Sequence, residues 1–290
     1  MSSDSPVKIR TMVDGDISFG LFLATEIEEW NYSTGDFQRL LHYAPEGCFI
    51  AEKNGKKAGI ATTTPYGRTA WIGTLIVHPS YRGKGIGRTL MEHAVNHLEA
   101  NGIETIRLDA VKKAVPLYKS LGFEEEFESL RFAGKGSDEI VHRAEKMKTG
   151  DLPEVVALDK RFTGLNREKV LRRVLSDFPD YCFMYRDEQQ KMTSFIMAKL
   201  VPSLLKIGPW ICEPDHPAAA VELLRATLLI AGENRAWAGI GTPSVNGKAV
   251  TILLEEGFEQ HPSSTRMVRG KRQRGENNSG IFGIGSPEKG

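Results

Sequence analysis

Apolar and polar positions along the first half of the chain follow two different periodicities. Short apolar runs bounded by turn residues predict buried strands, and the clearest of them covers residues 71–77 and ends at Pro79. Downstream, apolar residues recur every three or four positions, which predicts a helix with one buried face. The pattern predicts strands near 7–13, 47–53, 57–64, 69–77, 104–111 and 123–133, and helices within 14–42, over 87–101 and over 113–121.

A glycine-rich turn joins the strand at 69–77 to the helix at 87–101. Its sequence is Arg82-Gly83-Lys84-Gly85-Ile86-Gly87. The first N–H groups of a helix lack intrahelical acceptors and lie at the positive end of the helix dipole. Glycine lets such amides approach an anion without a Cβ clash, and the two basic side chains add positive charge. The turn is therefore predicted to bind a pyrophosphate.

The spacing of this turn restricts the kind of pyrophosphate. It reads R-x-x-G-x-G, which fits neither the G-x-G-x-x-G dinucleotide fingerprint nor the G-x-x-x-x-G-K-[ST] loop. With the upstream V-x-P of Val77-His78-Pro79, it resembles the acyl-CoA-binding motif of the GCN5-related N-acetyltransferases (GNAT). A second element agrees in order and spacing, because residues 114–123 read A-x-x-L-Y-x-x-x-G-F after a strand that ends at 108–110. The resemblance is strong over 45–133 and weaker beyond.

The chain also repeats itself weakly at an offset of 135 residues. Residues 12–17 match 147–152, 113–115 match 248–250, and the Gly-Phe pair at 122–123 matches the one at 257–258. A constant offset across the whole half favours two copies of one fold. We expect a boundary near 134–142, with one domain over 1–136, a second over 137–270 and a tail over 271–290.

The second copy lacks the features that would bind a phosphate. At the shared offset, proline, alanine and glutamate stand where the first copy has its basic residue and glycines, and leucine replaces the tyrosine of L-Y. The replacements are Arg82 by Pro217, Gly83 by Ala218, Gly85 by Ala220, Gly87 by Glu222 and Tyr118 by Leu253. Because proline lacks an amide donor and glutamate repels phosphate at a helix start, we predict one CoA site, in the N-terminal half. The C-terminal half would be a scaffold or one wall of the acceptor pocket.

The resemblance implies an α/β (α+β) fold with two GNAT-like domains. Each domain is expected to be a mixed, mostly antiparallel, twisted sheet flanked by helices, in which the parallel fourth and fifth strands splay apart. The pantetheine arm of acetyl-CoA would lie in that gap and pair with backbone groups of Leu75, Ile76 and Val77. The expected pyrophosphate-binding residues are Arg82, Gly83, Lys84, Gly85, Ile86, Gly87 and Arg88.

The resemblance also implies how the reaction would run. Tyr118, the tyrosine of the second element, would act as general acid and protonate the departing thiolate; its alternative role is a core aromatic. Many relatives carry a glutamate on the fourth strand as base, but residues 70–74 read AWIGT and contain no carboxylate. The remaining base candidates are Glu26, Glu28, Glu29 and Asp109, although acidic residues so close together are usually a solvated face. A water-mediated base or an already neutral amine are further alternatives.

Three aromatic residues are candidates for an apolar acceptor pocket, namely Trp30, Tyr32 and Trp71; ordinary core packing is the alternative for each. The net charge of +1 gives no electrostatic reason to expect nucleic acid or a membrane surface as a partner. The three cysteines show no metal-ligand spacing, so we expect no metal, and free thiols indicate a reducing compartment. With no apolar leader or spanning segment, a cytoplasmic location is expected.

Together these patterns predict an N-acetyltransferase that moves an acetyl group from acetyl-CoA to the primary amine of a small molecule. A protein or peptide acetyltransferase is one alternative, and a non-catalytic acyl-CoA sensor is another. Retention of Tyr118 favours an enzyme. The tail over 271–290 is expected to dock onto the body as an arm, and a homodimer is left open.

Overall fold

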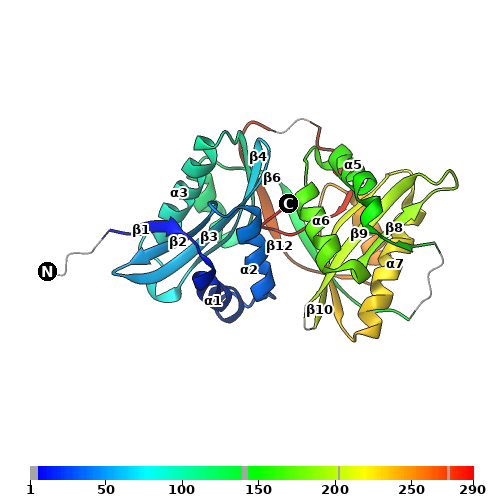
Figure 1. Cartoon of the computed structure of the whole chain (residues 1–290), viewed down its shortest axis with the longest axis horizontal. Helices are drawn as coiled ribbons and strands as arrows, with labels where there is room; N and C mark the ends of the chain where they lie inside the picture. Colours follow the sequence, from blue (N-terminus) through cyan, green and yellow to red (C-terminus); the bar gives the residue numbers. More distant parts are fainter. Residues whose placement is uncertain (1–5, 139–142, 202, 273–274) are drawn as a thin grey trace.

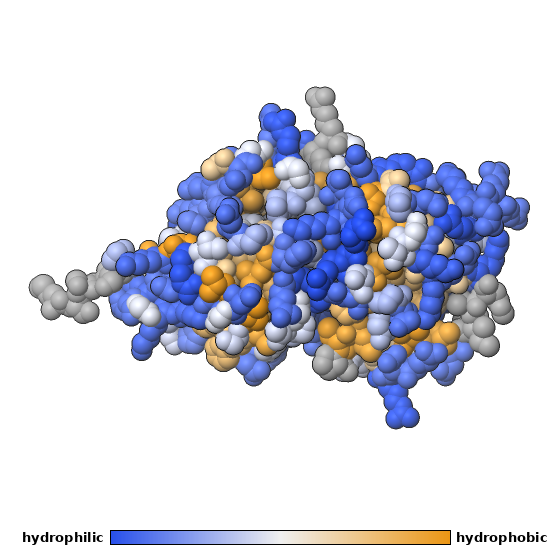
Figure 2. Space-filling model, viewed as in Figure 1, coloured by the Kyte–Doolittle hydropathy of each residue, from blue (hydrophilic) through white to orange (hydrophobic). Residues whose placement is uncertain are grey.

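The computed structural model describes residues 6–138, 143–201, 203–272 and 275–290. Two lobes of mixed α/β structure lie side by side, and the C-terminus lies between them (Figure 1). The expected boundary near 134–142 falls partly outside the described residues, at 139–142. Hydrophilic side chains cover most of the face seen in Figure 2, with apolar groups in smaller patches between them.

The predicted order of strands and helices is confirmed in the first half. Its elements are β1 (Lys8–Thr11), α1 (Ile17–Phe22), a π-helical turn (Leu23–Ile27), α2 (Thr34–Tyr43), β2 (Cys48–Lys53), β3 (Lys56–Tyr66), β4 (Thr69–Val77), α3 (Ile86–Ala100), β5 (Thr105–Ala110), α4 (Val115–Lys119) and β6 (Glu124–Lys135). The second half repeats this order. Its elements are β7 (Glu145–Lys146), α5 (Leu152–Thr163), α6 (Glu168–Asp177), β8 (Cys182–Arg186), β9 (Met192–Val201), β10 (Leu204–Cys212), α7 (Pro217–Glu233), β11 (Trp237–Pro243), α8 (Gly247–Glu255), β12 (Glu259–Gly270) and β13 (Ile281–Gly283).

The strands form one continuous sheet in which the two halves exchange a strand. The order is β1-β2-β3-β4-β5-β12-β6-β11-β10-β9-β8-β7, with β13 beside β10. Strand β12 of the second half thus lies antiparallel to β5, and β6 of the first half lies antiparallel to β11. The 135-residue repeat predicts β6 in the sheet of the first copy and does not predict this exchange. Because β6 and β12 also pair with each other, the lobes share a sheet and are held together at its centre.

Helix α3 packs on the first half of the sheet as its periodicity predicts. Leu90, Met91, Ala94, Val95 and Leu98 are all buried in one apolar cluster with residues of β2–β5. Burial of a leucine-sized side chain contributes about 1.5–3 kcal/mol, so this face fixes the helix firmly. The start of α3, where the glycine-rich turn ends, is therefore held at a defined place above β4.

The tail crosses from the second lobe to the first. Strand β13 pairs antiparallel with β10, while the Ile284 amide donates to the Gly241 carbonyl of β11 at 2.9 Å. Phe282 is fully buried between these two strands and packs against Trp210. Residues 286–290 then turn toward β3 and β4 of the first lobe, where the Tyr66 hydroxyl donates to the Lys289 carbonyl at 2.8 Å.

Candidate active site

The glycine-rich turn has the open backbone that an anion site needs. Gly83 and Gly85 have φ values of 74° and 78°, in the left-handed region that side chains other than glycine avoid. Gly85 is the residue that caps the start of α3, which runs for 15 residues from Ile86. A Cβ at either glycine would meet no other atom within 4 Å. The turn and the unpaired first amides of α3 therefore leave room for a phosphate group.

The basic side chains around this turn are tethered but remain exposed. The Arg82 guanidinium donates to the Val77 carbonyl at 3.0 Å and forms an ion pair with Glu28 at 2.6 Å. The Lys84 ammonium donates to the Ser80 carbonyl at 3.1 Å. Arg88, in the first turn of α3, donates to the Ser120 hydroxyl at 2.7 Å. These cations surround the turn with the charge expected for a pyrophosphate site.

Strands β4 and β5 separate next to the turn. They pair in parallel only from Thr69, opposite Thr105, to Trp71, opposite Arg107, in the part of the chain that the structure describes. Beyond that point β4 carries a bulge, and Thr74 there has a φ of 48°. The edge of β4 that faces β5 is thus available to an extended ligand. Leu75 and Val77 are half-buried and Ile76 is buried, which agrees with a role for their backbone rather than their side chains.

The second lobe has neither of these two features. Helix α7 already begins at Pro217, so residues that align with the glycine-rich turn form a helical turn, and Ala220 is buried in the core. The gap between β10 and β11 is filled by β13, which places Phe282 there. Among the described residues, the open turn and the gap next to it therefore occur together in the first lobe, and the second lobe lacks the equivalent pair.

Tyr118 lies on α4, whose start follows β5. Its ring packs against Phe123 at 6.0 Å between centroids and contacts the cluster under α3. Burial raises the pKa of Tyr118 to about 12, so its hydroxyl keeps its proton at neutral pH. A hydroxyl that keeps its proton suits a proton donor.

The four predicted base candidates are dispersed. Glu26 and Glu29 are exposed, and Glu28 is held by the Arg82 ion pair. The side chain of Asp109 is fully buried, accepts from the Ser129 hydroxyl at 2.5 Å and pairs with Arg266 at 2.9 Å. Burial favours its neutral form, but the Arg266 charge outweighs this and lowers the pKa of Asp109. The ion pair between Asp109 and Arg266 links the two lobes. Because the pKa of Asp109 is lowered, its carboxylate is a poor proton acceptor at neutral pH.

The three candidate pocket aromatics occupy two places. Trp30 and Tyr32 lie together in the segment that precedes α2, with ring centroids 5.9 Å apart. Trp71 lies on β4 among a different cluster, edge-on to Tyr66, with the Arg107 and Arg266 guanidinium groups over its ring. The structure therefore brings Trp30 and Tyr32 together but places Trp71 at the interface between the lobes.

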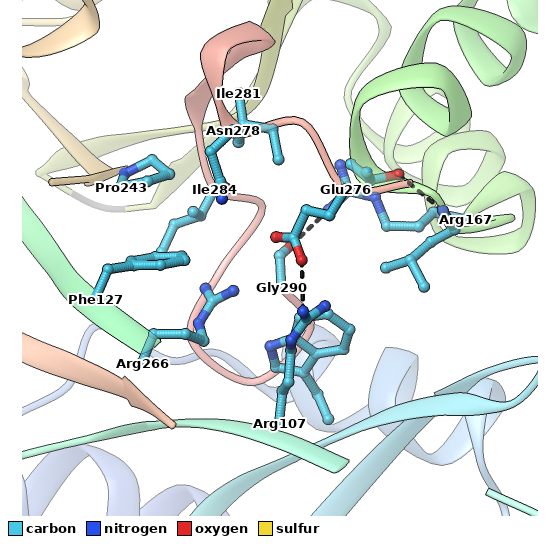
Figure 3. Close-up of a pocket in the computed structure, with 13 residues that line it drawn as sticks. Arg107, Phe127, Arg167, Pro243, Arg266, Glu276, Asn278, Ile281, Ile284 and Gly290 are labelled. Atoms are coloured by element: carbon cyan, nitrogen blue, oxygen red, sulfur yellow. Dashed lines mark hydrogen bonds and ion pairs between the residues drawn. The ribbon is translucent and has the colours of Figure 1, made fainter. Parts of the chain in front are cut away.

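A small cavity lies at that interface, beside Trp71 (Figure 3). Its volume of about 20 Å³ holds little more than one water molecule. Arg107 and Arg266 point into it from the shared sheet, and Glu276 of the tail pairs with Arg107 at 2.5 Å. The Arg167 guanidinium donates to the Gly290 carbonyl at 2.6 Å. The cavity thus belongs to the contact that holds the tail between the lobes.

A cluster of charged side chains beside Tyr32 was not found from the sequence. Asp36 of α2 forms ion pairs with Arg39, at 3.0 Å, and with Lys199 of β9. Glu288 of the tail pairs with Lys289 at 2.7 Å and interacts with Tyr32. These groups come from three segments that are more than 80 residues apart in the sequence, so no local sequence pattern predicts the cluster.

Within the described residues, no helix is both long and apolar enough to cross a membrane. Nor do any three His, Cys, Asp or Glu side chains among those described come together in a way that could hold a metal ion.

Comparison with known proteins finds a matching family model for each half of the chain. A model described as the acetyltransferase (GNAT) family matches residues 20–123, and a second, described as an acetyltransferase (GNAT) domain, matches residues 155–283. The chain is 24% identical over 266 residues to the holothin acyltransferase of Pseudoalteromonas sp. (strain SANK 73390), which covers 91% of this chain and 88% of that protein. It is 25% identical over 199 residues to an uncharacterized N-acetyltransferase of Bacillus subtilis (strain 168), covering 67% of this chain and 68% of that protein.

A solved structure has the same fold over nearly the whole chain. The crystal structure of a proposed acetyltransferase from Pyrococcus horikoshii superimposes with a TM-score of 0.83 at 23% identity, covering 98% of this chain and 96% of that chain. The chain therefore belongs to the acetyltransferase (GNAT) family, with two such domains in tandem, and is an acyltransferase.

Proposed function

We propose that the chain is an acetyl-CoA-dependent N-acetyltransferase that acts on the primary amine of a small molecule. The observation that carries this proposal is the pairing of an open glycine-rich turn at the start of α3 with the gap between β4 and β5. Both features lie in the first lobe, and the corresponding gap of the second lobe is filled. When bound, acetyl-CoA would supply the acetyl thioester.

Some residues of the first lobe would bind acetyl-CoA, and Tyr118 would transfer a proton. Amides of the turn and of the first turn of α3 would hold the pyrophosphate, helped by Arg82, Lys84 and Arg88. Backbone groups of β4 from the bulge to Val77 would align the pantetheine arm and polarise the thioester carbonyl. The amine nitrogen would attack the carbonyl carbon, so that a C–N bond forms as the C–S bond breaks. Tyr118 would give its proton to the thiolate, and the nitrogen would lose one to solvent.

Two features favour a small acceptor over a protein or peptide. The tail covers part of β3, because the carbonyl groups of Glu288 and Lys289 accept hydrogen bonds from Thr64 and Tyr66, and this leaves less room for an extended peptide. One relative that this chain matches over 88% of its length is named a holothin acyltransferase. A site enclosed by two lobes suits an acceptor of limited size.

A thiol-release assay with acetyl-CoA tests the proposal. The panel would contain methylamine, benzylamine, 2-phenylethylamine, spermidine, amino acid amides and short peptides, and calorimetry would measure acetyl-CoA binding separately. We expect binding, and CoA release that a small primary amine stimulates. Release stimulated only by peptides would favour the alternative acceptor class. Binding without stimulated release by any amine would favour an acyl-CoA sensor, and no binding would refute the assignment of the turn.

A further inference from the structure

Glu288 of the tail lies where β4 has no side chain. A Cβ built on Gly73 would lie 2.6 Å from the Cα of Glu288, so any other residue at position 73 would collide with the tail. The first lobe lacks a carboxylate over residues 70–74, and the tail brings one to this place on the strand. Gly73 is therefore a position at which only glycine leaves room for the tail beside β4.

Both lobes hold the tail at this place. Thr64 of β3 donates to the Glu288 carbonyl at 3.3 Å, and Tyr66 donates to the Lys289 carbonyl at 2.8 Å. Arg167, from the second lobe, donates to the Gly290 carbonyl at 2.6 Å. These bonds are buried, so breaking one leaves an unpaired polar group and costs about 1–3 kcal/mol. The backbone of the tail thereby fixes where the carboxylate of Glu288 lies.

The site lies at the point where β4 leaves β5. Gly73 follows the last residue of β4 that pairs with β5, Trp71, by two positions, and it precedes the bulge at Thr74. Leu75, the first residue expected to contact the pantetheine arm, comes directly after that bulge. A cation bound to Glu288 would therefore lie close to the end of β4 at which the thioester is expected.

The carboxylate of Glu288 already binds an ammonium group. The Lys289 ammonium lies 2.7 Å from its Oε1 atom, and both side chains are buried. Burial favours the neutral acid, but the charges of Lys289 and Lys199 outweigh it and lower the pKa of Glu288 to about 2. A group with so low a pKa is a poor base at neutral pH, because an efficient base has a pKa near the working pH. It is instead a constant anion, which suits the binding of a cation.

We infer that Glu288 binds the acceptor, receiving the ammonium group of a primary amine in the place that the Lys289 ammonium takes in this structure. The inference rests on the proposed function and adds a residue and a substrate class to it. The acceptor is a primary amine that Glu288 holds in its ammonium form beside the gap between β4 and β5, and the ammonium group loses one proton to solvent before its nitrogen attacks the carbonyl carbon. Lys289 acts as an internal competitor for the same carboxylate.

Two variants of the full chain should change acceptor binding in opposite directions. Lys289→Met removes the competing ammonium and should lower the KM for the amine that the wild-type chain acetylates fastest in the panel. Glu288→Gln/Lys289→Met removes the pair without leaving a lone buried charge, and should raise the same KM about 10- to 100-fold, the loss of one charge-assisted hydrogen bond. Acetyl-CoA affinity by calorimetry should stay unchanged in both. Glu259→Gln, an exposed carboxylate on β12, is the matched control.

A third variant tests the placement without altering any charge. Gly73→Ala inserts a Cβ into the tail and should also raise the amine KM while leaving acetyl-CoA affinity intact. Gly15→Ala, at a glycine whose Cβ would meet nothing within 4 Å, is its control.

Three outcomes would overturn the inference. An equal amine KM in the two lysine variants would show that Glu288 does not bind the acceptor, and a lower KM in both would show that the tail merely obstructs the site. An unchanged KM in Gly73→Ala would show that its placement is irrelevant. A wild-type chain that transfers acetyl to no amine would instead refute the proposed function.

Discussion

The glycine-rich turn can be tested with two alanine substitutions that strain the backbone equally. Gly85→Ala changes the residue that caps α3, at a φ of 78°, and Gly102→Ala changes the turn that follows the same helix, at a φ of 77°. A Cβ at either position would meet no other atom within 4 Å. Each variant should therefore lose about 1–2 kcal/mol of stability, because alanine disfavours the left-handed region. The two should melt at similar temperatures.

Only the first variant should lose affinity for acetyl-CoA. A Cβ at position 85 would keep a phosphate from the turn and weaken the bonds it accepts from the neighbouring amides. Hydrogen bonds to a charged group contribute about 1.5–3 kcal/mol each, so two such bonds contribute about 3–6 kcal/mol. At about 1.4 kcal/mol for each factor of ten, the Kd should rise at least about 100-fold.

Isothermal titration calorimetry with acetyl-CoA measures this difference directly. Gly102→Ala should bind like the wild-type chain, which would exclude general damage to α3 as the cause. Gly83→Ala, in the same turn at a φ of 74°, should behave like Gly85→Ala. If Gly85→Ala and Gly102→Ala bind acetyl-CoA with the same Kd, the pyrophosphate does not lie against this turn.

Three further predictions follow from the buried polar groups. Tyr118→Phe should lower kcat about 100-fold or more in the thiol-release assay with an unchanged acetyl-CoA Kd, since a general acid contributes that much; an unaltered kcat would remove Tyr118 from the mechanism. Arg266→Met leaves Asp109 buried without its partner and should cost about 3–5 kcal/mol in urea unfolding, whereas Arg172→Met at an exposed pair should cost at most about 1 kcal/mol. Because the pKa of Glu288 is lowered from 4.5 to about 2 in the folded chain, its contribution to stability is present above about pH 4.5 and is lost as the pH falls toward 2. The variant Glu288→Gln/Lys289→Met should show a smaller acid-induced drop in melting temperature over that interval, and an identical drop would contradict the assignment.

The glycine-rich turn and α3 were predictable because their determinants are local. A strand, three glycines and one apolar helix face lie within about 30 consecutive residues, and each acts through backbone geometry or periodicity. The left-handed conformations at Gly83 and Gly85 are the physical form of that local signal. The loss of the turn in the second copy was predictable for the same reason. Pro217 aligns with Arg82, and proline is favoured at the first position of a helix, so α7 begins where the first copy has its turn.

Strand exchange was not predictable, because alternation of apolar and polar residues says which face a strand buries and not which neighbour it pairs with. Strands β6 and β12 would show the same pattern beside β5 or beside β11. Long-range contacts help to decide which strand pairs with which. One of them is the ion pair between Asp109 and Arg266, which are 157 residues apart in the sequence. Asp109 was predicted as a base candidate for the same reason: a lone carboxylate on a strand looks available until its distant partner is known.

The tail accounts for one difference between the two domains, because it occupies the gap in the second lobe that stays open in the first. Strand β13 lies antiparallel to β10 in that gap. The same segment, anchored by Phe282, continues into residues 286–290 and brings Glu288 to Gly73. A strand that held its own carboxylate at position 73 would collide with this tail. The glycine on β4, the filled gap in the second lobe and the buried Glu288 are therefore parts of one arrangement, in which the tail of the second domain packs against the first.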